Sequence, residues 1–147
     1  MTTALPWWSG TVIYQLIVRT YSDGSGDGIG DFKGLSARLP YLRWLGVNTL
    51  WLTPIYPSPL RDGGYDITDF NGIHPDLGDL ASFHRFLTAA HSQGMRVILD
   101  LVLNHTSDLH PWFQRARWAP KGSPEREVYV WSDDPTRYAD APVLFRH

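Results

Sequence analysis

The stretch LDLVLNHT, residues 99–106, decides the fold, because it has the pattern of a buried strand that ends in polar side chains. Residues 97–103 are almost wholly apolar, which is typical of a parallel strand covered on both faces. Asp100 stands inside this run, where an unpaired charge is costly to bury. Asn104 and His105 follow at the carboxyl end, which is where a (β/α) barrel builds its active site. The stretch therefore predicts a strand with a functional site at its end.

Two further apolar strands and two amphipathic helices precede this stretch. Strands are predicted over residues 12–18 and 47–52, which are rich in β-branched, aromatic and aliphatic side chains. Leucines at helical spacing predict a helix over residues 35–45. A second helix is predicted to begin after an N-cap at Asp79 and to end at Gly94. Strand, helix, strand, helix and strand in this order predict parallel strands with right-handed crossovers in an α/β fold.

The residues after His105 break this alternation. Residues 106–147 are rich in proline, which predicts a loop-rich insertion in place of a third helix. A closed eight-stranded barrel takes roughly 200–250 residues, whereas this sequence has 147. We therefore expect residues 1–105 to form part of a TIM (β/α)8 barrel, namely its first three strands and two helices, and residues 106–147 to begin an inserted domain.

The composition excludes several classes of protein. Hydrophobic residues make up 43% of the chain, which suits a globular core. The net charge of −2 gives no reason to expect nucleic acid or an anionic membrane as a partner. No cysteine is present, so disulfides and thiolate metal sites are excluded. No secretory leader or membrane-spanning run is visible, so we expect a soluble, cytoplasmic protein of undefined oligomeric state.

Residues 23–31, DGSGDGIGD, follow the spacing of oxygen ligands in a calcium loop. Gly28 permits the sharp turn that such a loop needs, although Gly34 stands where a closing glutamate would be expected. The alternative is a glycine-rich turn with solvated acids. The candidate Ca²⁺ ligands are Asp23, Ser25, Asp27, the carbonyl of Ile29, and Asp31.

A second candidate site combines the loop after the second strand with the end of the third. Asp62 and Tyr65 flank paired glycines, which let the backbone turn tightly and bring the two side chains together. A carboxylate accepts hydrogen bonds from sugar hydroxyls, and a tyrosine ring covers the apolar face of a sugar. His105 would reach the same site. The alternatives are an ordinary turn with Tyr65 packed inward, and a histidine that belongs to the core.

These motifs resemble the α-amylase superfamily of glycoside hydrolases and transglycosylases. The residues DLVLNH, 100–105, are similar to the first conserved region of that family, at the end of barrel strand three. The residues GYDITD, 64–69, fit its α-glucosidase-like branch. The strings YPSPLRD, 56–62, and HTSDLHPWF, 105–113, look most like the trehalose synthases within that branch.

The resemblance implies a role for each residue of the second site. Tyr65 would stack under the glucose next to the scissile bond, and Asp62 and His105 would hydrogen-bond to its hydroxyls. Asp100 would organise the site from beneath. The branch also implies a small sugar substrate and conversion of maltose into trehalose by a retaining mechanism. Two carboxylates about 5–5.5 Å apart carry that mechanism.

The same resemblance implies that the reacting carboxylates follow barrel strands four, five and seven, which this sequence does not reach. We therefore expect a truncated, N-terminal part of a trehalose synthase-like enzyme that is inactive by itself, in which residues 106–147 begin the family's domain B. Two alternatives stay open. One is a part of an α-glucosidase or oligo-1,6-glucosidase, and the other is a sugar- or calcium-binding module without catalysis.

Overall fold

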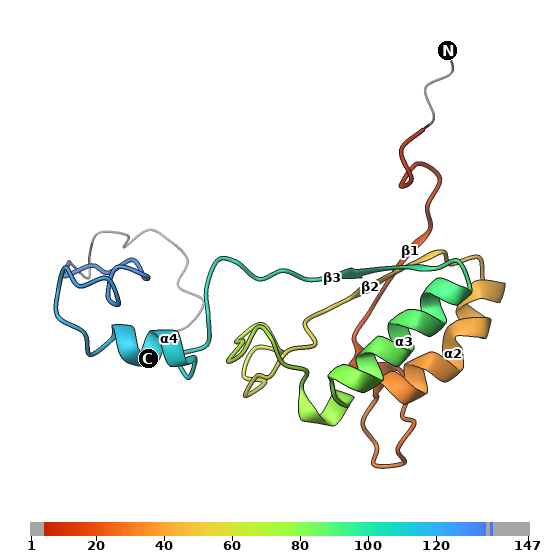
Figure 1. The fold of residues 1–147 in the computed structure, drawn as a ribbon, viewed down its shortest axis with the longest axis horizontal. Coiled ribbons are helices and arrows are strands. Elements are labelled where there is room, and N and C mark those ends of the chain that lie inside the picture. The colour runs from red at the N-terminus through yellow and green to blue at the C-terminus, as the bar shows by residue number, and fades with distance from the viewer. Residues whose placement is uncertain (1–4, 135, 137–147) are drawn as a thin grey trace. The chain divides into compact units, whose positions relative to one another are not determined.

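A computed structural model describes residues 5–134 and 136. Contacts divide the chain into two units, Met1–His110 and Pro111–His147. The first unit contains a parallel sheet with the strand order β1-β2-β3 (Figure 1). Its strands are β1 (Ile13–Leu16), β2 (Thr49–Leu52) and β3 (Arg96–Leu99). The predicted α/β arrangement with three parallel strands is confirmed.

Two long helices connect these strands and lie side by side on one face of the sheet (Figure 1). Helix α2 spans Phe32–Trp44 and α3 spans Leu80–Ser92. Asp79 caps α3 as predicted, because its side chain accepts from the Ser82 N–H at 2.7 Å and Ser82 caps it in return. The short helix α1 (Val18–Tyr21) and the 3₁₀ helix η1 (Pro75–Leu77) lie in the connections.

The hydrophobic core lies between the sheet and these two helices. Leu50 and Leu52 of β2 are fully buried, and Phe32 of α2 stacks on Phe86 of α3 with ring centroids 5.5 Å apart. The core orients the sheet, because side chains that alternate along β2 point toward the helices and leave Trp51 on the opposite face. That face carries the polar site described below.

The strands are shorter than predicted. β3 ends at Leu99, and Leu101 and Leu103 expose 68% and 79% of their surface, so the prediction of a buried strand through residue 103 is wrong. β3 ends here because its pairing partner β2 ends at Leu52, whose carbonyl accepts the Asp100 N–H. On the other edge of β3, no described strand is present to continue the pairing. β1 is likewise shorter than the predicted strand over residues 12–18. It ends at Leu16, and Val18 is already the first residue of α1.

Residues 111–134 of the second unit are loop-rich, as predicted, but they include a short helix that was not predicted, α4 (Pro111–Ala116). An aromatic cluster of Phe113, Tyr129 and Trp131 holds it, with Phe113 and Trp131 stacked at 5.9 Å. The guanidinium of Arg126 lies 4.0 Å from the Trp131 ring centre. Among the described residues, no helix is long and apolar enough to cross a membrane.

Candidate functional site

The loop after β2 places Asp62 and Tyr65 beyond the carboxyl end of the sheet. Gly63 and Gly64 have φ values of +77° and +107°, which side chains with a Cβ rarely adopt, so the tight turn between the two residues requires glycine. The Asp62 carboxylate closes this turn, because its Oδ1 accepts the N–H of Asp66 at 2.7 Å. Asp62 is half-buried, whereas Tyr65 exposes 37% of its surface, so the alternative of an inward-packed Tyr65 is wrong.

Asp100 is the centre of the polar contacts at this end of the sheet. Its Oδ2 accepts the hydroxyl of Tyr65 at 2.7 Å, and its Oδ1 accepts the indole N–H of Trp51 at 2.5 Å. The hydrogen bond to Asp100, together with burial and the nearby negative charge, raises the pKa of Tyr65 to about 12. The Tyr65 hydroxyl therefore stays protonated at neutral pH and donates a hydrogen bond to Asp100. Asp100, which the sequence pattern predicts inside a buried strand, is half-buried, and its carboxylate accepts hydrogen bonds from two side chains.

His105 lies at the same end of the sheet, against the main chain of Tyr65. Its Nε2 lies 3.2 Å from the main-chain oxygen of Tyr65, and its Nδ1 lies 3.4 Å from the side-chain amide of Asn104. The ring is exposed, so the alternative of a core histidine is wrong. Asp62, Tyr65, Asp100 and His105 thus form one cluster, although they come from two loops about 40 residues apart in sequence.

Asp62 and Asp66 have opposite pKa shifts. Burial, followed by the hydrogen bond and the negative charge of Asp66, raises the pKa of Asp62. Burial also acts to raise the pKa of Asp66, but hydrogen bonds from Ser58, Asp62 and the Arg61 N–H outweigh it, so the pKa of Asp66 lies below its usual value. Adjacent carboxyl groups with diverging pKa values are typical of sites that bind or move protons.

The sequence reasoning missed three residues that organise this cluster. Trp51 pairs with Ile98 in the parallel register of β2 and β3, and Asp100 follows two residues after Ile98. The strand register alone could therefore have indicated the contact between Trp51 and Asp100. Asp66 and Arg61 had no such signal. The Arg61 guanidinium donates to both carboxylate oxygens of Asp108, at 3.0 and 3.1 Å, and ties the loop after β2 to the segment after β3.

Main-chain hydrogen bonds fold the candidate calcium loop back on its first acid. Asp23 accepts main-chain N–H groups of Ser25, Gly26 and Gly28 at 2.7–2.9 Å, and these bonds lower its pKa. The bond from Gly28, whose φ is +88°, folds the loop back on its first acid. Asp27 accepts the N–H of Ile29 at 2.8 Å. These turns leave oxygen atoms at alternate positions, which suits Ca²⁺.

Two observations limit that fit. Asp31 is the N-cap of α2, and its Oδ1 accepts the Gly34 N–H at 2.6 Å, so one predicted ligand is already committed to the helix. Within residues 5–134 and 136, no three His, Asp or Glu side chains are gathered so that they could hold a metal ion. Close packing explains the missing glutamate, because a Cβ on Gly34 would lie 2.0 Å from the Ser22 carbonyl oxygen.

Comparison with known proteins gives the family context. The family model of the α-amylase catalytic domain matches residues 15–146. The trehalose synthase of Pimelobacter sp. (strain R48) is 52% identical over 139 residues, which are 95% of this chain and 24% of that protein. The glucan 1,6-alpha-glucosidase of Streptococcus dysgalactiae subsp. equisimilis is 47% identical over 129 residues, which are 88% of this chain and 24% of that protein.

A solved structure agrees with these relatives. A MutB mutant in complex with the substrate sucrose superimposes with a TM-score of 0.85 and 43% identity, and the match covers 90% of this chain and 24% of that one. The chain therefore spans about a quarter of the length of the relatives it matches.

Proposed function

This chain belongs to the α-amylase catalytic-domain family, and we propose that it supplies the first three strands and the glucose-binding wall of an enzyme that converts maltose into trehalose. The observation that carries the proposal is the cluster of Asp62, Tyr65, Asp100 and His105 at the carboxyl end of the sheet. That edge is where family barrels place their active sites. The similarity to a trehalose synthase over 95% of this chain supports the choice of reaction.

The geometry suits recognition of a glucose ring. The Tyr65 ring is partly exposed and is held in one orientation by its hydrogen bond to Asp100, so it offers a fixed flat surface for the apolar face of the sugar. Asp62 lies in the same turn, and His105 contacts the main chain of Tyr65, so both would bind hydroxyl groups at the rim of the sugar. Asp100 acts from beneath, because both of its carboxylate oxygens are already bonded to Tyr65 and Trp51.

The reaction itself requires groups other than these. In a retaining mechanism one carboxylate forms a covalent glucosyl intermediate while a second acts as acid and then as base. We assign neither role to a residue of this chain, because Asp62 and Asp100 are committed to the turn and to Tyr65. The reacting carboxylates would come from later strands of the family's barrel, so the 147 residues by themselves should not turn over maltose.

A segment exchange tests the proposal. The matching 139 residues of the Pimelobacter trehalose synthase are replaced by those of this chain, and products from maltose are measured by chromatography. We expect trehalose as the main product, and no product from the 147-residue chain alone. A chimera that folds but forms no trehalose would contradict the proposal.

A second candidate function is hydrolysis of α-glucosides, which the 47% identity to a glucan 1,6-alpha-glucosidase favours. The two candidates differ in their products. A chimera that releases two glucose molecules from maltose, or that cleaves isomaltose faster than it forms trehalose, would favour the hydrolase. Trehalose formation would favour the transferase.

We also propose that the loop of residues 23–31 binds Ca²⁺ as a structural ion. Asp23, Ser25 and Asp27 would supply side-chain oxygens, Ile29 its carbonyl, and Asp31 an oxygen reached through water. The folded-back loop supports this assignment, since the Gly28 N–H donates to Asp23 and the chain turns sharply at this glycine. The ion would stiffen the connection between α1 and α2.

A further inference from the structure

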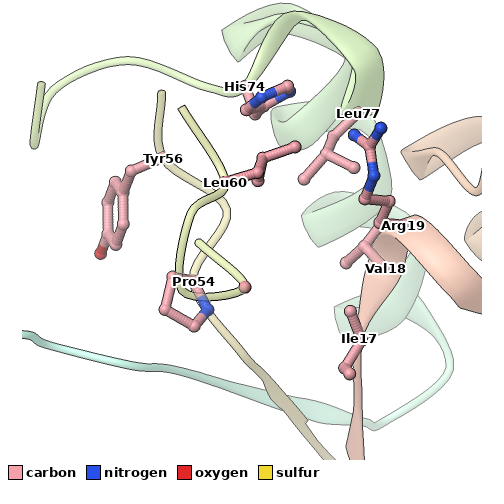
Figure 2. Close-up of a pocket in the computed structure, with 9 residues that line it drawn as sticks. Ile17, Val18, Arg19, Pro54, Tyr56, Leu60, His74 and Leu77 are labelled. Carbon is pink, nitrogen blue, oxygen red and sulfur yellow. The ribbon is translucent and has the colours of Figure 1, made fainter. Parts of the chain in front are cut away.

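The loop that carries Asp62 contains the one non-glycine residue with a positive φ in the described part of the chain. Leu60 has φ +60°, a conformation that costs free energy for a branched side chain and persists only where the surroundings impose it. Its side chain points toward Leu77 and His74 in a pocket of about 30 Å³ (Figure 2), which has room for little more than a water molecule. The Leu60 side chain is therefore enclosed with little spare space.

Ser58 and Asp66 are the polar groups that bind the main chain at Leu60 and at the following residue. The Ser58 hydroxyl donates to the Asp66 carboxylate in a short hydrogen bond and accepts the Leu60 N–H at 2.9 Å. The second oxygen of Asp66 accepts the Arg61 N–H at 3.1 Å. One carboxylate thus binds both ends of the strained segment that leads directly into Asp62.

Asp66 also holds Asp62 directly, through the 2.7 Å bond from its main-chain N–H. Resting on the function proposed above, we propose that Asp66 is a positioning residue, which anchors the strained turn through its carboxylate and thereby fixes the Asp62 carboxylate for a glucose hydroxyl. Ser58 acts with it. Asp66 does not reach the sugar itself, because its two oxygens are taken by Ser58 and by the main chain.

Charge gives Asp66 a second effect on Asp62. The negative charge of Asp66 helps to keep the pKa of Asp62 above its usual value. Removing that charge with Asp66→Asn should therefore lower the pKa of Asp62 and move the acid limb of sugar binding to lower pH. The titratable and charged groups next to Asp62 in its own loop are Arg61, Tyr65 and Asp66. Asp100, His105 and Asp108 after β3 contact that loop through Tyr65 and Arg61.

A double-mutant cycle in the chimera separates positioning from general stability. Asp66→Ala should lower kcat/KM for maltose about tenfold or more, the loss typical of a hydrogen bond to a charged group. In an Asp62→Asn background the same change should cost less than about twofold, because the carboxylate that Asp66 positions is already gone. Ser58→Ala should follow the same pattern. Asp69→Ala, an exposed acid three residues further along that caps a separate turn, is the matched control and should change neither value.

The same double-mutant cycle can be measured on glucose affinity by calorimetry. This measurement does not depend on catalytic turnover. Coupling between Asp62 and Asp66 in affinity, with the acid limb moved to lower pH by Asp66→Asn, supports the positioning role even if the chimera makes no trehalose. In that case only the proposed function fails. Equal losses in both backgrounds overturn the positioning role, and so does a folded chimera that binds no glucose.

Discussion

Tyr65 combines two properties that act together only because Asp100 lies beneath it. The hydroxyl donates to Asp100 at 2.7 Å, and the pKa of about 12 keeps that donor protonated throughout the working pH range of ordinary enzymes. The ring is therefore held in place while 37% of the surface of Tyr65 stays exposed. Neither residue would be useful alone, because an unanchored ring loses entropy on binding and an unpaired Asp100 would be poorly solvated.

Replacing Tyr65 separates the ring from the hydroxyl. In the chimera, Tyr65→Phe keeps the ring but removes the donor, and should lower kcat/KM for maltose about tenfold, as expected for loss of one hydrogen bond to a carboxylate. Tyr65→Ala removes the surface as well and should cost several times more. Tyr41→Phe, on the exposed side of α2, is the control and should leave the rate unchanged. Equal rates for Tyr65→Phe and the unsubstituted chimera would show that the hydroxyl does not position the ring.

Among the secondary-structure elements, the connections carry most of the chemistry. The two helices are held by the core, while the loops are held by side-chain oxygens that accept main-chain N–H groups, as Asp23 and Asp62 do. Arg19 and Asp76 join α1 to η1 by an ion pair. Such contacts depend on charge, so pH and metal ions should act on the loops before they act on the core.

The Arg19–Asp76 ion pair predicts a local dependence on pH. The hydrogen bond from Arg19 lowers the pKa of Asp76. Because the folded-state pKa is depressed, this stabilisation is complete above the unfolded pKa of about 3.9 and is lost as the pH falls through the lower folded value. Asp76→Asn should weaken the α1–η1 contact by less than about 1 kcal/mol at pH 7, since both side chains are about one third exposed.

Hydrogen exchange measured by mass spectrometry on the chimera checks this prediction. Amides of α1 and η1 should exchange faster in Asp76→Asn than in the unsubstituted protein at pH 7, and the difference should shrink progressively as the pH falls below about 3.9. A difference that persists at low pH would indicate that shape and not charge is responsible. Asp69→Asn serves as the control.

The calcium loop predicts an effect of a single acid. Ca²⁺ should bind the chimera and raise its unfolding temperature, and Asp27→Ala should weaken that binding at least about tenfold, since even outer-shell losses weaken metal binding by this amount. Asp133→Ala, an acid outside the loop, should not. Calorimetry that detects no heat for Ca²⁺, or the same affinity in both variants, would remove the loop as a metal site.

On the scale of the whole molecule, the sheet has one covered face and one open face. Helices α2 and α3 cover the first, while Trp51 and Ile13 expose 37% and 48% of their surface. In a family barrel the inward-facing side chains of the strands are packed in layers against those of the other strands. The described residues include no strand that pairs with the outer edge of β3, so both an apolar face and an unpaired edge are open.

We therefore expect the 147-residue chain to self-associate when it is isolated. Sedimentation velocity should show species larger than a monomer, and a dye that binds apolar surface should fluoresce. Leu101→Ser combined with Leu103→Ser should reduce the association, because both side chains are more than two thirds exposed next to the open edge. Leu80→Ser, exposed on α3, should not. A soluble monomer with a cooperative thermal transition would contradict this expectation.

The sequence by itself determined the order of strands and helices, the cap of α3 and the parallel topology, because these depend on local periodicity and on chain connectivity. It also indicated Asp62, Tyr65, Asp100 and His105 one by one. Only the tertiary structure decided which groups they touch, since Trp51, Asp66 and Arg61 meet this cluster through strand register and a turn with a left-handed Leu60. The length of β3 was decided there as well, because a strand ends where its hydrogen-bonding partner ends, and no local pattern of apolar residues records where that is.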